Sequence, residues 1–195
     1  MLTDSNGPGM DKFASAAEQE TVVFGAARPG DRAGELGHWL EVMQAHAIRR
    51  VCCLLSERQL RRYDNLLAAY AQTFGVERVC WAPVPDFQVV PRLLLRQQIL
   101  PFLHQADQAQ ERVVVHCAGG VGRTGQVLAA WLVAGRGFSR QEAIATVRRR
   151  GRNPYEAVVA APFYGRNPWR VAAAVNELLD DLHGWDWQGH EAEPE

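Results

Sequence analysis

Hydrophobic and polar positions along the chain follow two patterns, one typical of buried strands and one typical of helices. Short apolar runs predict four strands, at residues 21–24, 50–55, 78–82 and 113–117. Apolar residues three or four positions apart predict six helices, at residues 34–47, 57–74, 92–110, 123–134, 139–149 and 169–182. Strands that alternate with helices indicate an α/β fold, with a central, mostly parallel sheet of four to five strands flanked by helices.

Turn-forming and polar residues set the expected limits of the folded domain. Residues 1–20 are small and polar and contain Gly7-Pro8-Gly9, which predicts a flexible N-terminal arm. We expect a single domain at residues 21–184 and a frayed C-terminal tail at residues 185–195. Inside the domain, residues 153–168 show no regular period and are expected to be irregular.

Length, charge and cysteine content narrow the class of protein. A chain of 195 residues with net charge -1 suits one globular domain and gives no reason to expect nucleic acid as a partner. No apolar run approaches the ~20 residues of a membrane span, and the N-terminus lacks the pattern of a signal peptide. Four cysteines in a chain of this length do not form a disulfide framework. We therefore expect a cytoplasmic monomer without a membrane partner.

The segment from His116 to Gly125 carries the strongest chemical signal, because a predicted strand ends there and a predicted helix begins. Glycines at positions 119, 120 and 122 let consecutive backbone N–H groups point to one side without Cβ clashes. Such a loop at a helix N-terminus binds a phosphate dianion. The expected phosphate-binding residues are Ala118, Gly119, Gly120, Val121, Gly122 and Arg123.

Three side chains of this segment are suited to attack on the bound phosphate. The field of the loop and the helix N-terminus favours the thiolate of Cys117 over the thiol, and a thiolate beneath a phosphate is aimed at phosphorus. The planar fork of Arg123 can hold two phosphate oxygens as charge shifts in the transition state. Thr124 can place a hydroxyl near the sulfur and help it to leave when a phosphocysteine is hydrolysed.

Two checks bear on how specific this signal is. Cys52 and Arg58 have the same spacing as Cys117 and Arg123, but no glycine lies between them and Glu57 would repel phosphate. We interpret that first match as a coincidence. A nucleotide-binding Walker loop would need glycine in place of Cys117 and lysine in place of Arg123, so it does not fit. The structural alternative is a glycine-rich turn with an incidental cysteine.

The segment His116 to Gly125 resembles the His-Cys-x5-Arg-Thr-Gly signature of the protein tyrosine phosphatase superfamily, in its compact dual-specificity branch. The resemblance covers roughly residues 21–150 and includes the strand ending in Leu-Leu-Ser and the loop Pro85-Asp86-Phe87. It implies a dual-specificity phosphatase-like fold, phosphorylated proteins as substrates, and catalysis without a cofactor.

The resemblance also implies roles for two residues around the signature. A general acid is needed on a separate loop, and Asp86 fits because it follows a predicted strand and precedes Cys117 by 31 residues. It would protonate the leaving oxygen and later deprotonate the attacking water. His116 would hold the cysteine loop through backbone hydrogen bonds. The alternatives are that Asp86 caps a turn and that His116 is a satisfied buried polar group.

The other chemically active residue types have simpler interpretations. The remaining histidines show no paired ligand spacing, so we expect no metal. Cys52, Cys53 and Cys80 are expected to pack as small apolar groups. A reversible disulfide with the nucleophile, which some relatives form, stays open. The arginine-rich stretch at residues 148–152 is interpreted as a solvated helix end.

The first hypothesis is a phosphatase acting on phosphotyrosine, and on phosphoserine or phosphothreonine, of proteins. The alternative keeps this chemistry and changes the substrate to a phosphoinositide or an RNA 5′ end. Inositide-directed relatives often carry lysines inside the loop, where residues 118–121 offer none. A non-catalytic phosphate-binding module is disfavoured because Cys117, Arg123 and Asp86 are all present. A redox or sulfur-transfer enzyme is disfavoured by the loop length and by the lack of a Cys-x-x-Cys pair.

Overall fold

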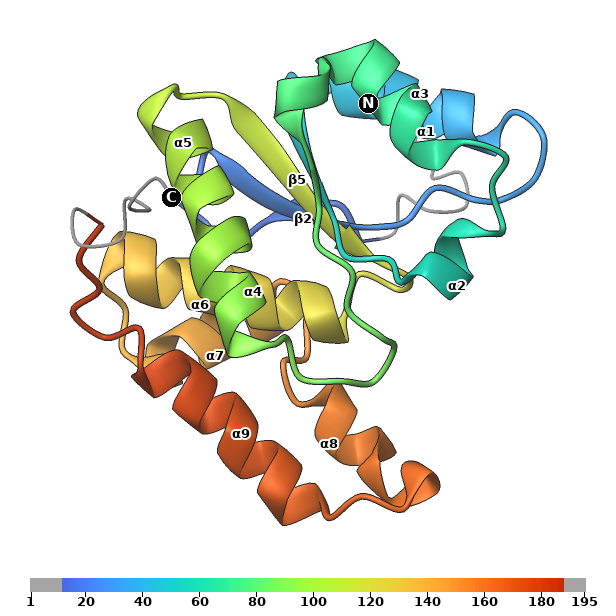
Figure 1. Ribbon diagram of the computed structural model, residues 1–195. Helices are drawn as coiled ribbons and strands as arrows, with labels where there is room; N and C mark the ends of the chain where they lie inside the picture. The colour runs from blue at the N-terminus through green and yellow to red at the C-terminus, as the bar shows by residue number, and fades with distance from the viewer. Residues whose placement is uncertain (1–11, 188–195) are drawn as a thin grey trace, which may run out of the picture.

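The computed structural model describes residues 12–187 and shows helices on both faces of a five-stranded sheet (Figure 1). The strands are β1 (Ala14–Ser15), β2 (Val23–Ala27), β3 (Ile48–Cys53), β4 (Val79–Trp81) and β5 (Arg112–Cys117). Their order is β1-β2-β5-β3-β4, with β1 antiparallel to β2 and all other neighbours parallel. The predicted α/β fold with a mostly parallel sheet is confirmed.

The helices divide between the two faces of this sheet (Figure 1). One face is covered by α1 (Glu35–Ala45) and α3 (Leu66–Phe74). The other is covered by α5 (Leu100–Gln108) and α6 (Gly122–Arg136), and α6 contacts α7 (Arg140–Arg149) and α9 (Pro168–Asp180). Shorter elements are α2 (Glu57–Leu60), η1 (Val76–Arg78), α4 (Arg92–Leu94), η2 (Leu95–Ile99), α8 (Glu156–Ala160) and η3 (Ala161–Tyr164). Across residues 12–187, no helix is both long and apolar enough to cross a membrane.

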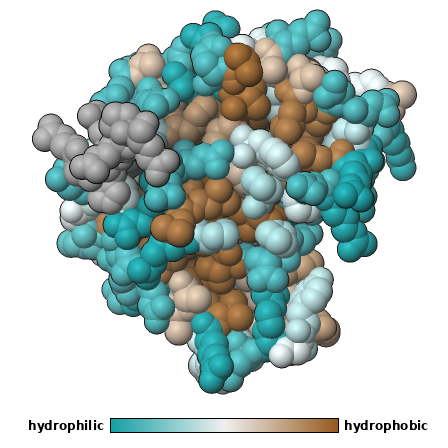
Figure 2. Space-filling model, in the orientation of Figure 1, coloured by the Kyte–Doolittle hydropathy of each residue, from teal (hydrophilic) through white to brown (hydrophobic). Residues whose placement is uncertain are grey.

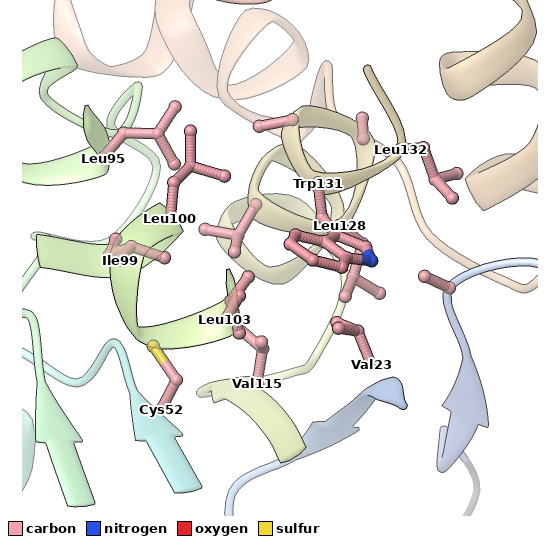
Figure 3. Close-up of a cluster of buried hydrophobic side chains, with 14 of the residues drawn as sticks. Val23, Cys52, Leu95, Ile99, Leu100, Leu103, Val115, Leu128, Trp131 and Leu132 are labelled. Atoms are coloured by element: carbon pink, nitrogen blue, oxygen red, sulfur yellow. The ribbon is translucent and has the colours of Figure 1, made fainter. Parts of the chain in front are cut away.

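The core forms two clusters because successive side chains of a strand point to opposite faces. On β5, Val113 and Val115 belong to the cluster under α5 and α6, whereas Val114 belongs to the cluster under α1 and α3. Figure 3 shows side chains of α5 and α6, among them Leu103 and Trp131, gathered over the first of these faces. The central strands are therefore buried on both faces, as their continuous apolar runs predict.

In the view of Figure 2, hydrophobic residues come to the surface near the middle of the molecule and hydrophilic residues surround them.

Residues 14–20 belong to the fold, although the sequence placed them in a flexible arm. β1 pairs with β2, and Ala16 is fully buried. The carboxylate of Glu20 accepts hydrogen bonds from Trp131 (3.0 Å) and Arg136 (2.9 Å) of α6. A two-residue edge strand has too few positions to show a period, and the partners of Glu20 lie more than 100 residues away. Neither feature could be predicted from the local pattern.

Part of the predicted tail at residues 185–195 also packs against the domain. Trp187 contacts the main core cluster and stacks on His104 with ring centroids 4.1 Å apart. Residues 1–11 of the predicted arm and residues 188–195 of the predicted tail lie outside the described residues.

Two predicted helices differ from the observed ones. The helix predicted at 57–74 is divided into α2 and α3, because the chain leaves the helical conformation at 61–65 and Asn65 has an extended φ of -162°. The helix predicted at 92–110 contains the π-helical segment η2 just before Pro101. Proline cannot donate a hydrogen bond to the preceding turn, and a wider π turn accommodates the missing bond.

Candidate active site

The predicted site residues lie at the carboxyl ends of neighbouring parallel strands, which is where α/β sheets usually bind ligands. Cys117 is the last residue of β5, and α6 begins at Gly122. Asp86 lies on the loop after β4, while Leu54 connects β3 towards α2. The strand order places β3 between β4 and β5, so loops that are distant in sequence meet at one edge of the sheet.

The glycines of the phosphate loop, defined as residues 118–122 between β5 and α6, differ in what an added side chain would meet. Gly120 has a φ of +65°, and a Cβ there would lie 2.4 Å from the carbonyl oxygen of Ala26. Gly119 is exposed, and a Cβ at this position would meet nothing within 4 Å. At Gly122 a Cβ would lie 2.2 Å from Oε2 of Glu156, so contacts restrict Gly120 and Gly122 and leave Gly119 free.

Cys117 is covered, whereas the rim of its loop is open. Only 2 % of the residue is exposed, while Ala118 is half-buried and Gly119 is exposed. The carbonyl oxygen of Cys117 accepts a hydrogen bond from the Arg28 N–H (3.0 Å). The end of β5 is thereby tied to the chain that follows β2.

The guanidinium of Arg123 reaches across the site to the loops after β3 and β4. Nη1 donates to the carbonyl oxygens of Val84 (2.7 Å) and Leu54 (3.3 Å). Nη1 also donates to Oε1 of Gln59 (2.9 Å), and Nη2 donates to Oδ1 of Asp86 (2.8 Å). The Nε–H and the second Nη2–H have no hydrogen-bond partner among residues 12–187, so one edge of the fork is available for two phosphate oxygens.

Asp86, the predicted general acid, lies beside Arg123. Its side chain is 43 % exposed, and Oδ2 accepts a hydrogen bond from Nε2 of Gln59 (3.2 Å). The next residue, Phe87, has a φ of 55°, which is uncommon for a residue other than glycine. Nη2 of Arg166 donates to the carbonyl oxygen of Phe87 (2.6 Å). This contact from the end of η3 holds the strained turn that directs Asp86 towards Arg123.

His116 and Thr124, the two remaining predicted catalytic residues, are fully buried. Nε2 of His116 lies 3.1 Å from the hydroxyl of Tyr70 on α3. Burial lowers the pKa of His116 to about 3, so its ring is neutral at physiological pH. Oγ1 of Thr124 has no hydrogen-bond partner within the described part of the chain. His116 therefore joins the end of β5 to α3, and the catalytic roles of both residues stay predictions.

Sequence reasoning missed two residues in the segment after α7. Arg152 is 2 % exposed and donates from Nη1 to the carbonyl oxygen of Gly120 (2.7 Å), so the interpretation as part of a solvated helix end is wrong for this residue. The carboxylate of Glu156 lies against Gly122, where an added Cβ would be 2.2 Å from Oε2, and burial raises the pKa of this carboxyl. The available signal was Gly151, whose φ of +77° after a helix end turns the chain back towards the core. The segment expected to be irregular thus forms α8 and η3 and borders the loop.

Two hollows in the surface lie beside the loop that carries Asp86 and Phe87. The larger, of about 580 Å³, is lined by Ser56, Arg58, Gln59, Arg62, Pro85, Asp86, Phe87 and Tyr164. The smaller, of about 370 Å³, is lined by Phe87, Asn153, Glu156, Val159, Ala160, Phe163 and Tyr164. Phe87 and Tyr164 belong to both, with ring centroids 5.8 Å apart. The site therefore has one side that carries arginines and one side that is mostly apolar.

The other three cysteines are buried free thiols, as expected for small apolar groups. Cys53 on β3 pairs with His116 on β5, and burial raises the pKa of its thiol to about 12. At neutral pH it is therefore protonated and a weak nucleophile.

Comparisons with known proteins agree with this geometry. The family model of the dual specificity phosphatase catalytic domain matches residues 54–158, which include every predicted site residue. The structure of Tk-PTP in its active form shares 24% identity, covers 86% of this chain and 97% of its own, and has a TM-score of 0.63. PTPMT1 in complex with PI(5)P shares 16% identity, with coverages of 89% and 98% and a TM-score of 0.67. Kinase associated phosphatase, with its catalytic-site cysteine replaced by serine, shares 20% identity, with coverages of 84% and 89% and a TM-score of 0.62.

The structural likenesses establish the fold, and the family match spans more than half of the chain, from the end of β3 to α8. With a cysteine at the end of β5, an arginine reaching across the phosphate loop and an aspartate beside it, the chain belongs to the dual specificity phosphatases, which are cysteine-based phosphatases of the protein tyrosine phosphatase superfamily.

Proposed function

We propose that this protein hydrolyses phosphate monoesters on proteins, phosphotyrosine first and phosphoserine or phosphothreonine second, through a phosphocysteine on Cys117. The single observation that carries the proposal is the contact between Nη2 of Arg123 and Oδ1 of Asp86 (2.8 Å). This contact brings the guanidinium of Arg123 and a carboxyl group together at the edge of the sheet where β5 ends with Cys117. A glycine-rich turn with an incidental cysteine would have no reason to assemble this set.

In the first step the thiolate of Cys117 attacks phosphorus in line with the ester oxygen. The sulfur–phosphorus bond forms as the bond from phosphorus to the ester oxygen breaks. Arg123 and the N–H groups of the phosphate loop hold the three remaining oxygens and stabilise the charge that moves onto them. Asp86 transfers its proton to the leaving oxygen, because a phenol or alcohol leaves poorly as an anion.

In the second step water attacks the phosphocysteine and releases inorganic phosphate. Asp86, now a carboxylate, takes a proton from the water. The bond between phosphorus and sulfur breaks, and the hydroxyl of Thr124 supports the departing thiolate. The buried ring of His116 holds the end of β5 against α3 through its contact with Tyr70 while the phosphoryl group is transferred.

A phosphoinositide substrate is the second candidate, and two observations favour it. The fold resembles that of PTPMT1, whose structure contains PI(5)P. The larger hollow beside Asp86 is lined by Arg58 and Arg62, which could meet a second phosphate. Against it, residues 118–121 carry no basic side chain. Proteins are therefore the first proposal, because the loop itself has contacts for one phosphate group only.

The test is a substrate panel of a phosphotyrosyl peptide, a phosphothreonyl peptide, a phosphoinositide and a 5′-phosphorylated RNA. The wild type, Cys117→Ser and Asp86→Ala are compared, with Cys53→Ser as the matched control because it is another buried cysteine next to His116. We expect the phosphotyrosyl peptide to give the highest kcat/KM, no turnover by Cys117→Ser, and wild-type behaviour of the control. A chelator should leave the activity unchanged.

Robust turnover by Cys117→Ser would contradict the phosphocysteine mechanism. A preference of the wild type for the inositide or the RNA would leave the mechanism standing and overturn the choice of protein substrates.

A further inference from the structure

Arg152 lies behind the phosphate loop and connects three parts of the chain. Nη1 donates to the carbonyl oxygen of Gly120 (2.7 Å), and Nη2 donates to the carbonyl oxygen of Gly25 on β2 (2.7 Å). Nη2 also contacts the carbonyl oxygen of Lys12. Only 2 % of the residue is exposed. The guanidinium thus holds the back of the loop against the sheet and the N-terminal segment.

The charge of Arg152 has no carboxylate partner among residues 12–187. Its hydrogen-bond acceptors are carbonyl oxygens, and Nε has no partner within the described residues. Burial lowers the pKa of the guanidinium to about 10, and attraction to Cys117 acts in the opposite direction. The group is therefore a cation at neutral pH. Burying a cation without a carboxylate partner is unfavourable, and an anion held in the loop would compensate it.

The contact at Gly120 determines where the next N–H group points. In a trans peptide the C=O of one residue and the N–H of the next point in opposite directions, and residues 12–187 contain no cis peptide bond. The carbonyl of Gly120 is directed backwards to Arg152. The N–H of Val121 consequently points forwards, to the side on which a phosphate would be held.

The peptide bond between Val121 and Gly122 is oriented in the same way. The carbonyl oxygen of Val121 accepts a hydrogen bond from the N–H of Asn153 (3.2 Å), so residues 152 and 153 hold two consecutive carbonyls from behind. The N–H of Gly122 consequently points the other way, and the carboxylate of Glu156 lies against this residue. An acidic side chain is thus already placed next to the loop, whose N–H groups suit anions.

We propose that Arg152 is a positioning residue of the phosphate loop, which turns the loop N–H groups towards the substrate and supplies a fixed positive charge behind the bound phosphate. This inference rests on the proposed phosphatase function of the loop. Arg152 itself does not touch the substrate, because the Gly120 carbonyl lies between them. It acts before any substrate binds, whereas Arg123 acts on the phosphate directly.

The test uses the full chain with Arg152→Met, which removes fork and charge, and Arg152→Lys, which keeps the charge without the fork. Arg149→Met is the matched control, because Arg149 lies in the same arginine-rich stretch, is exposed, and among residues 12–187 forms a side-chain hydrogen bond only with Thr146 of its own helix. We measure kcat and KM on a phosphotyrosyl peptide and the inhibition constant of inorganic phosphate. Thermal unfolding with and without phosphate gives a binding readout that needs no turnover.

We expect Arg152→Met to lower kcat/KM about 100-fold and to raise the phosphate inhibition constant about 10-fold, in the range found for loss of one transition-state donor. Arg152→Lys should recover part of the phosphate binding, and Arg149→Met should stay within about 2-fold of wild type. A purely structural role would lower the melting temperature and leave the stabilisation by phosphate unchanged.

A cooperatively folded Arg152→Met with wild-type KM, phosphate inhibition and stabilisation by phosphate would overturn the proposal. If Arg152→Met does not fold, Arg152→Lys provides the test. An unchanged phosphate inhibition constant in Arg152→Lys would then overturn the proposal. If the wild type turns over no phosphomonoester, the proposed function fails. Phosphate-dependent melting of the wild type and the Arg152 variants then still decides whether Arg152 organises an anion site.

Discussion

Arg123 and Arg152 are two equally buried arginines on opposite sides of one loop, and they have different partners. Each is 2 % exposed. Arg123 pairs with the exposed carboxylate of Asp86 and keeps part of its fork uncommitted. Arg152 binds only carbonyl oxygens and has no carboxylate partner within the described residues. The front of the loop therefore holds an anion that a substrate can replace, whereas the back is fixed.

This difference assigns separate tasks to the two sides of the phosphate loop. A phosphate that first binds the uncommitted edge of Arg123 would then compete with Asp86 for the guanidinium, because both are anionic oxygen ligands and the carboxylate is accessible to water. We propose that displacement from Arg123 leaves Asp86 free to carry the proton that the leaving oxygen needs. The carbonyls behind the loop have no such competitor, so the geometry of its N–H groups persists through the cycle.

The largest expected effect comes from the front of the loop. Arg123→Lys replaces a fork by a point charge that cannot hold two phosphate oxygens. We expect kcat/KM to fall about 10³-fold or more, as for other arginines that stabilise a transferring phosphoryl group. Steady-state kinetics on the phosphotyrosyl peptide provide the measurement. A loss of less than about 10-fold would mean that Arg123 is not the main phosphate ligand.

Asp86→Asn separates proton transfer from competition for Arg123. We expect kcat to fall by about 10²-fold, because the leaving oxygen loses its acid. Inorganic phosphate should inhibit this variant more strongly than the wild type, since a negative charge no longer occupies the front of the fork. A weaker inhibition by phosphate would contradict the view that substrate replaces Asp86.

The back of the loop can be tested with two neighbouring glycines. Gly120→Ala places a Cβ 2.4 Å from the Ala26 carbonyl oxygen at a φ of +65°, and we expect a loss of about 1–3 kcal/mol in the free energy of unfolding. Gly119→Ala meets nothing within 4 Å and should change stability by less than about 0.5 kcal/mol. Denaturant unfolding of both variants measures the difference. Equal losses would show that the loop is not held against β2.

The last expected effect concerns His116, at the end of β5 where the phosphate loop begins, and depends on pH. The pKa of His116 is about 3 in the folded protein and 6.5 in the unfolded chain, so only the unfolded state takes up a proton between these values. Stability is therefore fully present above about pH 6.5 and is lost as pH falls, by roughly 1.4 kcal/mol per pH unit. Urea unfolding between pH 7 and 5 should show this slope in the wild type and a flatter curve in His116→Gln. Parallel curves would indicate that other groups determine the slope.

The sequence predicted the front of the site because its signals are local or tied to strand ends. The run from His116 to Gly125 contains the proposed nucleophile, the glycines and the arginine within ten consecutive positions. Asp86 could be identified because it follows an apolar run that forms β4, and parallel strands deliver their carboxyl ends to one edge. The alternation of strands and helices likewise determined the fold class.

The back of the site could not be predicted, because its contacts join residues with no common pattern. Arg152 contacts Gly120 and Gly25, which lie 32 and 127 positions away, and reads locally as one of several arginines at a helix end. Glu156 lies in a segment whose five-residue helix is too short for a hydrophobic period. In the same way β1 and Glu20 depended on partners in β2 and α6.

The phosphocysteine itself can be observed directly. Wild type is mixed with a phosphotyrosyl peptide carrying labelled phosphate, quenched in acid within one turnover, and digested for mass spectrometry. We predict a labelled phosphoryl group on the peptide that contains Cys117, its slower formation in Asp86→Ala, and its absence in Cys117→Ser. Turnover without a labelled cysteine, or a label that persists in Cys117→Ser, would contradict the central claim.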